Sequence, residues 1–288
     1  MSKNIKLAKH SGFCYGVKRA VETVKKLKAQ NPNKDVFILG ELIHNSHVIK
    51  ELESLGIKTI SELPKKGSGI CVIRSHGASP EIFDQITEAG FELFDLTCPD
   101  VKKVQQKAIG LVQDGYFLII VGKAEHPEVI AIKASAERFG SNIFVASDVS
   151  QLKPIEQKIK EHKRVGVVVQ TTQRLATLNS IVEYLTSISK ELTIANTICN
   201  STTLRQNEAR ELAEESDLMI VVGSKKSANT THLAEILKGI TKTIHIEDDK
   251  ELESYKNVIT DANNIAITAG ASTPENIIEN VINKLKGG

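Results

Sequence analysis

The sequence lacks tryptophan and has few other aromatic residues, with 8 phenylalanines and 4 tyrosines among 288 residues. Nucleic-acid surfaces that stack bases depend on aromatic rings, so this scarcity argues against such a surface. Lysine plus arginine number 37 and aspartate plus glutamate 35, which gives a net charge of +2. This balance excludes polyanion binding by bulk charge. We therefore expect no nucleic-acid partner, and any phosphate must be recognised by local groups.

Long apolar segments are also missing. No run approaches the roughly 18 residues that a membrane-spanning helix needs, and residues 1–8 lack the apolar core of a signal peptide. We expect a cytoplasmic protein without a membrane partner. Disulfides are rare in that compartment, so the positions of the four cysteines matter more than their number.

The composition, 41% hydrophobic and 25% charged, is that of a globular protein. Short runs rich in valine and isoleucine predict buried parallel strands at 36–39, 70–73, 117–121, 165–169, 218–222 and 265–268. Amphipathic stretches between them predict helices that include 15–29, 101–113, 173–187, 203–215 and 274–285. This alternation predicts an α/β fold with mainly parallel sheets, whose loops at the carboxyl ends of the strands carry the chemistry.

Three cysteines occupy matching places in this pattern. Cys14, Cys98 and Cys199 each follow a predicted strand (5–9, 91–96 and 192–195) and precede a predicted helix. About 30 residues after each cysteine, a strand ends in a polar cluster that contains His44, His126 or Asn229. A second polar strand end follows in each case, with His76, Thr171 or Ser272.

The repeat predicts three related α/β units at 1–96, 97–195 and 196–288. Each unit is small for an independent domain, so we expect the three to pack around a shared centre.

Thiolates at helix N-termini are stabilised by the helix dipole, and three of them together favour a soft metal centre. Zinc is disfavoured because no Cys-x-x-Cys pair is present. A [4Fe–4S] cluster held by three cysteines would leave one iron open to substrate. Cys71 lies inside the apolar run 70–73 and is interpreted as a core residue.

The polar strand ends predict a phosphate site and a proton donor. Helix N-termini favour anions, and the hydrogen-bond donors at these places are His44, His76, Ser227, Asn229 and Ser272. Glu128, two residues after His126, becomes a proton donor if it is enclosed, and otherwise is an ordinary first-turn glutamate. Thr171 is either part of this site or a simple helix cap.

Six segments together resemble the 4-hydroxy-3-methylbut-2-enyl diphosphate reductase family, from residue 11 to residue 272. They are Ser11-Gly12-Phe13-Cys14-Tyr15-Gly16-Val17, Asp95-Leu96-Thr97-Cys98-Pro99, His126-Pro127-Glu128-Val129, Gln170-Thr171-Thr172, Thr197-Ile198-Cys199 and Thr268-Ala269-Gly270-Ala271-Ser272.

The resemblance implies a trefoil of three α/β units around a [4Fe–4S] cluster held by Cys14, Cys98 and Cys199. It implies reductive removal of the allylic hydroxyl as water, giving isopentenyl and dimethylallyl diphosphate. Electrons would come from a ferredoxin or flavodoxin.

Specific roles follow for the other site residues if the resemblance holds. Glu128 would supply protons through Thr171, with His126 nearby. The diphosphate would be bound by His44, His76, Ser227, Asn229 and Ser272. The chain departs from the family at Ser227-Ala228-Asn229, where members commonly have Ser-Ser-Asn, and this removes one hydroxyl.

Two other functions use the same residues. An iron–sulfur redox sensor with a phosphorylated ligand would need the cysteines but no proton donor. A zinc-dependent phosphohydrolase is disfavoured because the sequence has neither Cys-x-x-Cys nor His-Glu-x-x-His.

Overall fold

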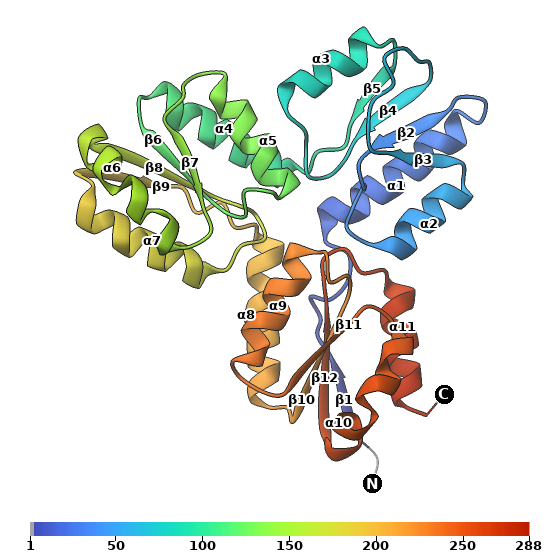
Figure 1. Ribbon diagram of the computed structural model, residues 1–288. Helices are drawn as coiled ribbons and strands as arrows, with labels where there is room; N and C mark the ends of the chain where they lie inside the picture. The colour runs from blue at the N-terminus through green and yellow to red at the C-terminus, as the bar shows by residue number, and fades with distance from the viewer. Residues whose placement is uncertain (1–2, 288) are drawn as a thin grey trace. The chain divides into compact units, whose positions relative to one another are not determined.

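The computed structural model describes residues 3–287, which contain three four-stranded sheets with every strand pair parallel (Figure 1). The chain divides into two compact units, and each is described by itself. Compact unit 1 comprises Met1–Val21, Ile43–Leu52 and Asn200–Gly288, and compact unit 2 comprises Glu22–Leu42 and Glu53–Cys199. No helix within residues 3–287 has both the length and the apolar character needed to span a bilayer.

The N-terminal sheet has the order β3-β2-β4-β5. Its strands are β2 (Val36–Leu39), β3 (Ile57–Ile60), β4 (Ile70–Ile73) and β5 (Glu92–Asp95), and the helices of this part of the chain are α1 (Tyr15–Gln30), α2 (Ser46–Ser54) and α3 (Pro80–Glu88). Every residue of β4 is buried, as its unbroken apolar sequence predicts for a central parallel strand. Ile86 of α3 packs against Cys71 and Ile73, so α3 covers one face of this sheet.

The middle sheet has the order β7-β6-β8-β9. Its strands are β6 (Phe117–Val121), β7 (Ile143–Ala146), β8 (Arg164–Val169) and β9 (Glu191–Ile194), and its helices are α4 (Pro99–Gln113), α5 (Pro127–Glu137), α6 (Glu156–His162) and α7 (Leu175–Ile188). Helices α4 and α5 pack on Leu118 and Ile120, and helices α6 and α7 pack on Ile119 and Val121. Successive side chains of β6 therefore point alternately into two hydrophobic cores, one on each face of the sheet.

The C-terminal sheet has the order β1-β12-β10-β11. Its strands are β1 (Asn4–Leu7), β10 (Leu218–Val222), β11 (Thr243–Ile246) and β12 (Asn264–Ala269), and its helices are α8 (Asn200–Glu214), α9 (Ala228–Lys238), α10 (Lys256–Asp261) and α11 (Glu275–Leu285). Figure 1 shows α8 and α9 on one face of this sheet and α11 on the other. Ala209 and Leu233 pack on Met219 from the first face, while Val281 packs on Ile220 from the second.

All three sheets share one topology. When β1 is counted as the fourth strand of the C-terminal sheet, the first strand of each sheet (β2, β6 or β10) lies between the second (β3, β7 or β11) and the third (β4, β8 or β12), and the fourth (β5, β9 or β1) lies at the edge next to the third. The chain therefore leaves β2, β6 and β10 toward one edge of the sheet, and it leaves β4 and β8 toward the other edge. In open parallel sheets, ligands bind at the carboxyl ends of two such strands, where the order reverses.

The predicted α/β fold with three parallel-sheet units is confirmed. The apolar runs 36–39, 70–73, 117–121 and 218–222 are strands with those bounds, and the predicted helices begin and end within three residues of the observed ones. The boundaries at 96 and 195 fall between strands of different sheets, and the placing of the unit boundaries at these residues stays a prediction.

One strand was placed in the wrong unit. We assigned the strand before Cys14 to the unit 1–96, but β1 pairs with β12, with Ile5 opposite Ile265. It therefore completes the C-terminal sheet in the way that β5 and β9 complete the other two. An apolar pattern predicts that a strand exists but does not say which sheet edge it joins.

Gly223 provides a test of the close packing beneath α9. Its φ is +138°, and an added Cβ would lie 2.3 Å from Thr273 Oγ1. Gly223→Ala is expected to lower the free energy of unfolding by about 1–3 kcal/mol, because it combines backbone strain with overpacking. Urea denaturation measures this change. The matched control is Gly110→Ala in α4, where nothing lies within 4 Å of the new methyl group, and about 0.5–1 kcal/mol of stabilisation is expected. A Gly223→Ala protein as stable as the wild type would contradict the packing argument.

Candidate active site

The same tight turn follows the third strand of every sheet. In each, the backbone N–H of the fourth residue donates to the carbonyl of the first, at 3.0–3.1 Å. The turns are 74–77 after β4, 170–173 after β8 and 270–273 after β12. Each turn lies at the reversal of strand order, where a ligand site is expected.

Each of the three predicted ligand cysteines is joined to one of these turns. The backbone N–H of Cys98 donates to the Ser75 carbonyl at 2.9 Å, and that of Cys199 donates to the Thr171 carbonyl at 3.0 Å. The N–H of Cys14 donates to the Ala271 carbonyl at 3.1 Å. In every case the acceptor is the second residue of the turn, so the three cysteines occupy equivalent places.

The surroundings of these cysteines suit thiolates. All three are partly buried and directly precede or cap a helix, namely α1, α4 or α8. The Val17 N–H donates to Cys14 Sγ at 3.5 Å. Helix N-termini and N–H donors stabilise a negative sulfur. Cys71 differs, because it is fully buried in β4 and its burial raises the pKa of its thiol to about 11.

Glu128 is enclosed, with 2% of its surface exposed. The Thr171 N–H donates to Glu128 Oε1 at 2.6 Å, and Thr171 Oγ1 donates to Oε2 at 2.8 Å. His126 caps α5, and its Nδ1 accepts the N–H of Glu128 at 3.2 Å. An ordinary first-turn glutamate is exposed to solvent, whereas this carboxyl faces the turn after β8.

Burial raises the pKa of Glu128 to about 7. The two hydrogen bonds from Thr171 favour the carboxylate and oppose this shift, while the negative charge of Asp100 adds to it. A carboxyl with a pKa near neutrality both holds and releases a proton under physiological conditions. It is therefore suited to general acid catalysis.

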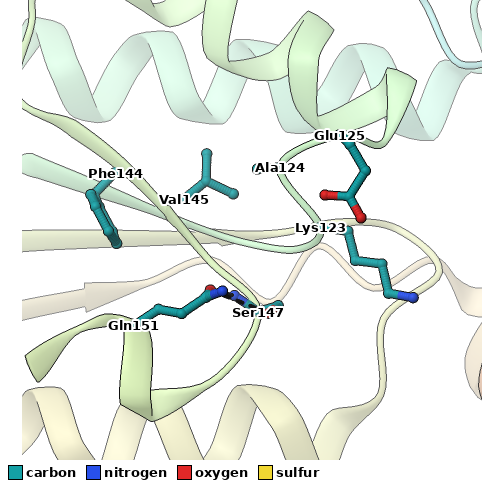
Figure 2. A pocket seen from close by; sticks show the side chains of 7 residues that line it. All are labelled: Lys123, Ala124, Glu125, Phe144, Val145, Ser147 and Gln151. Atoms are coloured by element: carbon teal, nitrogen blue, oxygen red, sulfur yellow. Dashed lines mark hydrogen bonds between the residues drawn. The ribbon is translucent and has the colours of Figure 1, made fainter.

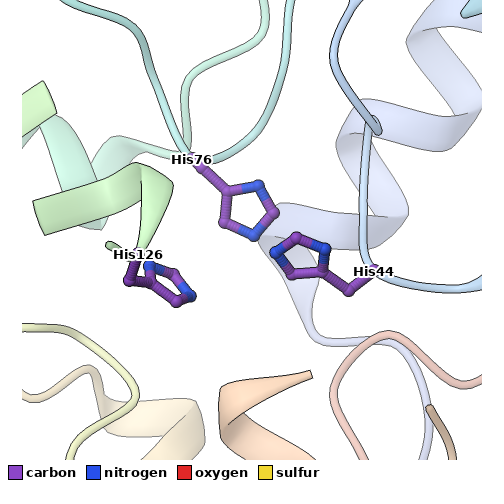
Figure 3. A group of neighbouring side chains, drawn as sticks. All are labelled: His44, His76 and His126. Carbon is purple, nitrogen blue, oxygen red and sulfur yellow. The ribbon is translucent and has the colours of Figure 1, made fainter. Parts of the chain in front are cut away.

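His76 and His126 lie against each other. Their ring centroids are 5.5 Å apart and their planes cross at 80° (Figure 3). His76 is the third residue of the turn whose second residue, Ser75, binds the Cys98 N–H. Within compact unit 2, a series of contacts therefore connects two of the cysteines. It runs from the turn that binds Cys98 through His76, His126 and Glu128 to Thr171, whose carbonyl accepts the Cys199 N–H.

Compact unit 1 holds the other predicted phosphate donors. Ser227 caps α9, and its Oγ accepts the Thr230 N–H at 3.5 Å. Ser272, the third residue of its turn, donates to the His44 carbonyl at 3.4 Å. Asn229 is 4% exposed, and within residues 3–287 no hydrogen-bond partner accepts from its Nδ2. A buried amide donor without an acceptor is costly unless a ligand supplies one.

The alignment of the three repeats within the sequence matched one residue wrongly. We aligned Thr171 with His76 and Ser272, but the turns place Thr172 as their counterpart, since each is the third residue. Thr172 Oγ1 accepts a hydrogen bond from Gln170 Nε2 at 3.0 Å. The correct match follows if the first residues of the turns are aligned, which are Arg74, Gln170 and Gly270. Their side chains have nothing in common, so the sequence offers no signal for this alignment.

A separate cavity of about 470 Å³ opens at the carboxyl ends of β6 and β7 (Figure 2). Ser147 donates from N and from Oγ to Gln151 Oε1, at 2.7 and 3.2 Å. The other lining residues are Lys123, Ala124, Glu125, Phe144 and Val145. None of the predicted site residues lines this cavity, so it is treated as separate from the site.

Comparison with known proteins gives a consistent picture. The model of the LytB protein family matches residues 5–286. A protein of Geobacter sulfurreducens named 4-hydroxy-3-methylbut-2-enyl diphosphate reductase is 39% identical over 283 residues, which cover 98% of this chain and 96% of that protein.

Two solved structures cover 99% of this chain. One is an (E)-4-hydroxy-3-methyl-but-2-enyl diphosphate reductase, described as the terminal enzyme of the non-mevalonate pathway, with 36% identity, a TM-score of 0.72 and 99% of its own chain covered. The other is the E-1-hydroxy-2-methyl-but-2-enyl-4-diphosphate reductase of Plasmodium falciparum, with 27% identity, a TM-score of 0.89 and 88% of its chain covered. The chain therefore belongs to the LytB family of reductases.

Proposed function

We propose that this enzyme reduces (E)-4-hydroxy-3-methylbut-2-enyl diphosphate to isopentenyl and dimethylallyl diphosphate. Two electrons and two protons are consumed, the allylic C–O bond breaks, and the hydroxyl leaves as water. The observation that carries the proposal is the buried Glu128–Thr171 pair, which lies beside the amide of Cys199. The names of the relatives support the substrate.

The cofactor of the proposal is a [4Fe–4S] cluster held by Cys14, Cys98 and Cys199. The donor set fits, because three partly buried sulfurs lie at helix N-termini and are fixed by equivalent amide hydrogen bonds. When bound, such a cluster supplies single electrons and an iron able to accept an oxygen ligand. A ferredoxin or flavodoxin is the proposed electron donor.

Proton transfer is the task of Glu128. In the structure, Thr171 Oγ1 donates to the Glu128 carboxylate. With Glu128 protonated, the same contact reverses, so that Glu128 donates to Thr171 Oγ1 and this hydroxyl donates to the leaving hydroxyl of the substrate. His126 fixes the first turn of α5 and thereby the direction of the carboxyl.

The diphosphate is proposed to bind His44, His76, Ser227, Asn229 and Ser272. Asn229 supplies the strongest support, since a phosphate oxygen would accept from its buried Nδ2. Ala228 contributes no hydroxyl, so Ser227 is the capping side chain available here.

The alternative of a redox sensor gains no support from the site. A sensor needs the cysteines but has no use for a buried acid, and burying a carboxyl is costly. The enclosed Glu128 therefore favours an enzyme.

The metal content tests the cofactor. Protein purified without oxygen is expected to contain about four irons and four acid-labile sulfides per chain. Serine substitution of Cys14, Cys98 or Cys199 should lower the iron content, because each removes a ligand. Cys71→Ser is the matched control and should keep the full cluster. Zinc without sulfide would refute the cluster and favour the phosphohydrolase.

Replacing Glu128 tests the proton donor. Glu128→Gln keeps the size and the hydrogen-bond acceptor but cannot give a proton, so kcat is expected to fall about 100-fold or more. Substrate affinity and iron content should stay unchanged. The control is Glu125→Gln, an exposed acid three residues earlier. Steady-state kinetics with a chemical reductant would separate the two variants, and near-normal turnover of Glu128→Gln would remove Glu128 from the mechanism.

The raised pKa also predicts a pH effect on stability. Because the folded pKa of Glu128, about 7, lies above the ordinary value of 4.5, the folded state binds this proton more tightly than the unfolded state. The contribution of Glu128 to stability is therefore complete below pH 4.5 and falls as the pH rises to about 7, by up to roughly 3 kcal/mol.

Urea denaturation of wild type and Glu128→Gln at pH 5 and pH 8, in the same cluster state, measures this effect. The wild type should lose more stability between the two pH values than the variant does. Equal losses would mean that Glu128 titrates with an ordinary pKa.

A further inference from the structure

The connection that carries Cys14 is the longest of its kind. Six residues separate the end of β1 from Cys14, whereas two separate β5 from Cys98 and four separate β9 from Cys199. A longer connection has more conformations to lose on folding, so it needs additional contacts to hold one geometry. These contacts come from helix α8.

Glu208 of α8 holds the first part of this connection. Its Oε1 accepts the N–H of Lys9 and its Oε2 accepts the N–H of His10, both at 2.7 Å. His10 Nδ1 lies 3.1 Å from the same Oε2. Short hydrogen bonds to a charged carboxylate are stronger than those between neutral groups.

Arg205, one helical turn earlier, holds the second part. Its side chain is 3% exposed, and its Nη2 donates to the Gly12 carbonyl at 2.9 Å. Its Nη1 donates to the Ala269 carbonyl at 2.6 Å. Ala269 ends β12 and directly precedes the turn 270–273, which accepts the Cys14 N–H. The planar guanidinium thus joins the two backbone segments that meet at Cys14.

The arginine at this helix position is not repeated after the other two cysteines. Arg205 follows Cys199 by six residues, and the residues six places after Cys98 and Cys14 are Val104 and Ala20. Both are buried apolar residues. Of the three helices that follow a cysteine, α8 is thus the one with an arginine at this position, and this arginine contacts the longest of the three connections.

We propose that Arg205 and Glu208 form a positioning clamp that fixes the Cys14 connection and thereby the hydrogen bond from the Val17 N–H to Cys14 Sγ. Because hydrogen bonds to ligand sulfurs set the reduction potential of iron–sulfur clusters, the clamp adjusts that potential. This consequence rests on the proposed function, since it requires Cys14 to be a cluster ligand. Neither residue touches substrate in this role.

The experiment compares Arg205→Met and Glu208→Gln with two controls on the same helix, Arg210→Met and Glu211→Gln. Hydrogen exchange followed by mass spectrometry on the full chain reports on the clamp whether or not a cluster is bound. Residues 9–14 are expected to exchange roughly tenfold faster in both clamp variants, because each loses bonds to a charged group. The buried strands β10 and β12 should be unchanged.

The midpoint potential of the anaerobic holoenzyme separates positioning from charge. If only charge mattered, losing Arg205 would make the potential more negative and losing Glu208 would make it more positive. The clamp predicts a shift to more negative values in both, because both relax the same Sγ hydrogen bond. Arg205→Lys keeps the charge but not the two-pronged contact, and it should shift the potential as Arg205→Met does.

Unchanged exchange in residues 9–14, or opposite shifts in potential, would overturn the clamp. Should Arg205→Met fail to fold, Glu208→Gln still decides, since its side chain lies nearer to solvent. Wild-type protein without a four-iron cluster would instead refute the proposed function, and the exchange comparison would still test the clamp.

Discussion

The site depends on one hydrogen bond that occurs three times, from a cysteine amide to the second carbonyl of a turn. It joins the edge strand that precedes the cysteine to the central strand that ends in the turn. Residues far apart in sequence, such as Cys14 and Ala271, are thereby held in one geometry. The side chains of the turn, including Thr171 and Ser272, are placed relative to a sulfur by the backbone alone. Chemistry that requires accurate placement is thus supported by backbone hydrogen bonds between neighbouring strand ends.

Burial supplies the second constraint, and it acts on Glu128. Removing a carboxyl from water favours its neutral form, and the hydrogen bonds from Thr171 limit how far that preference goes. The same threonine therefore orients the acid and moderates its proton affinity. The cost of keeping this carboxyl enclosed is met by the apolar packing of α4 and α5 on β6, where Val104, Val129 and Ile132 are fully buried.

Much of this arrangement could be predicted from the sequence because apolar runs such as 70–73 and 117–121 are short and rich in valine and isoleucine, which favours buried parallel strands. The cysteine repeat was visible because each cysteine is flanked by a strand pattern and a helix pattern. The partner of β1 was not predictable, because edge pairing depends on the whole sheet. Thr172 was misaligned because turn geometry is fixed by backbone bonds and not by side-chain type. In the sequence, Arg205 and Glu208 look like ordinary surface residues of a helix. The fold brings the connection before Cys14 against them, and its residues Lys9, His10 and Gly12 make the contacts.

The pairing of β1 with β12 also orders events during synthesis. Asn4 and Asn264 lie opposite each other across 260 residues of chain. During synthesis, β1 is made 260 residues before its partner β12 and stays unpaired until β12 exists. The N-terminal and middle sheets contain only strands between residues 36 and 194 and can form earlier. The amide of Cys14 finds its acceptor, Ala271, only after the strands of the other two sheets have been made, so any metal centre that uses this cysteine takes its final geometry after those sheets can form.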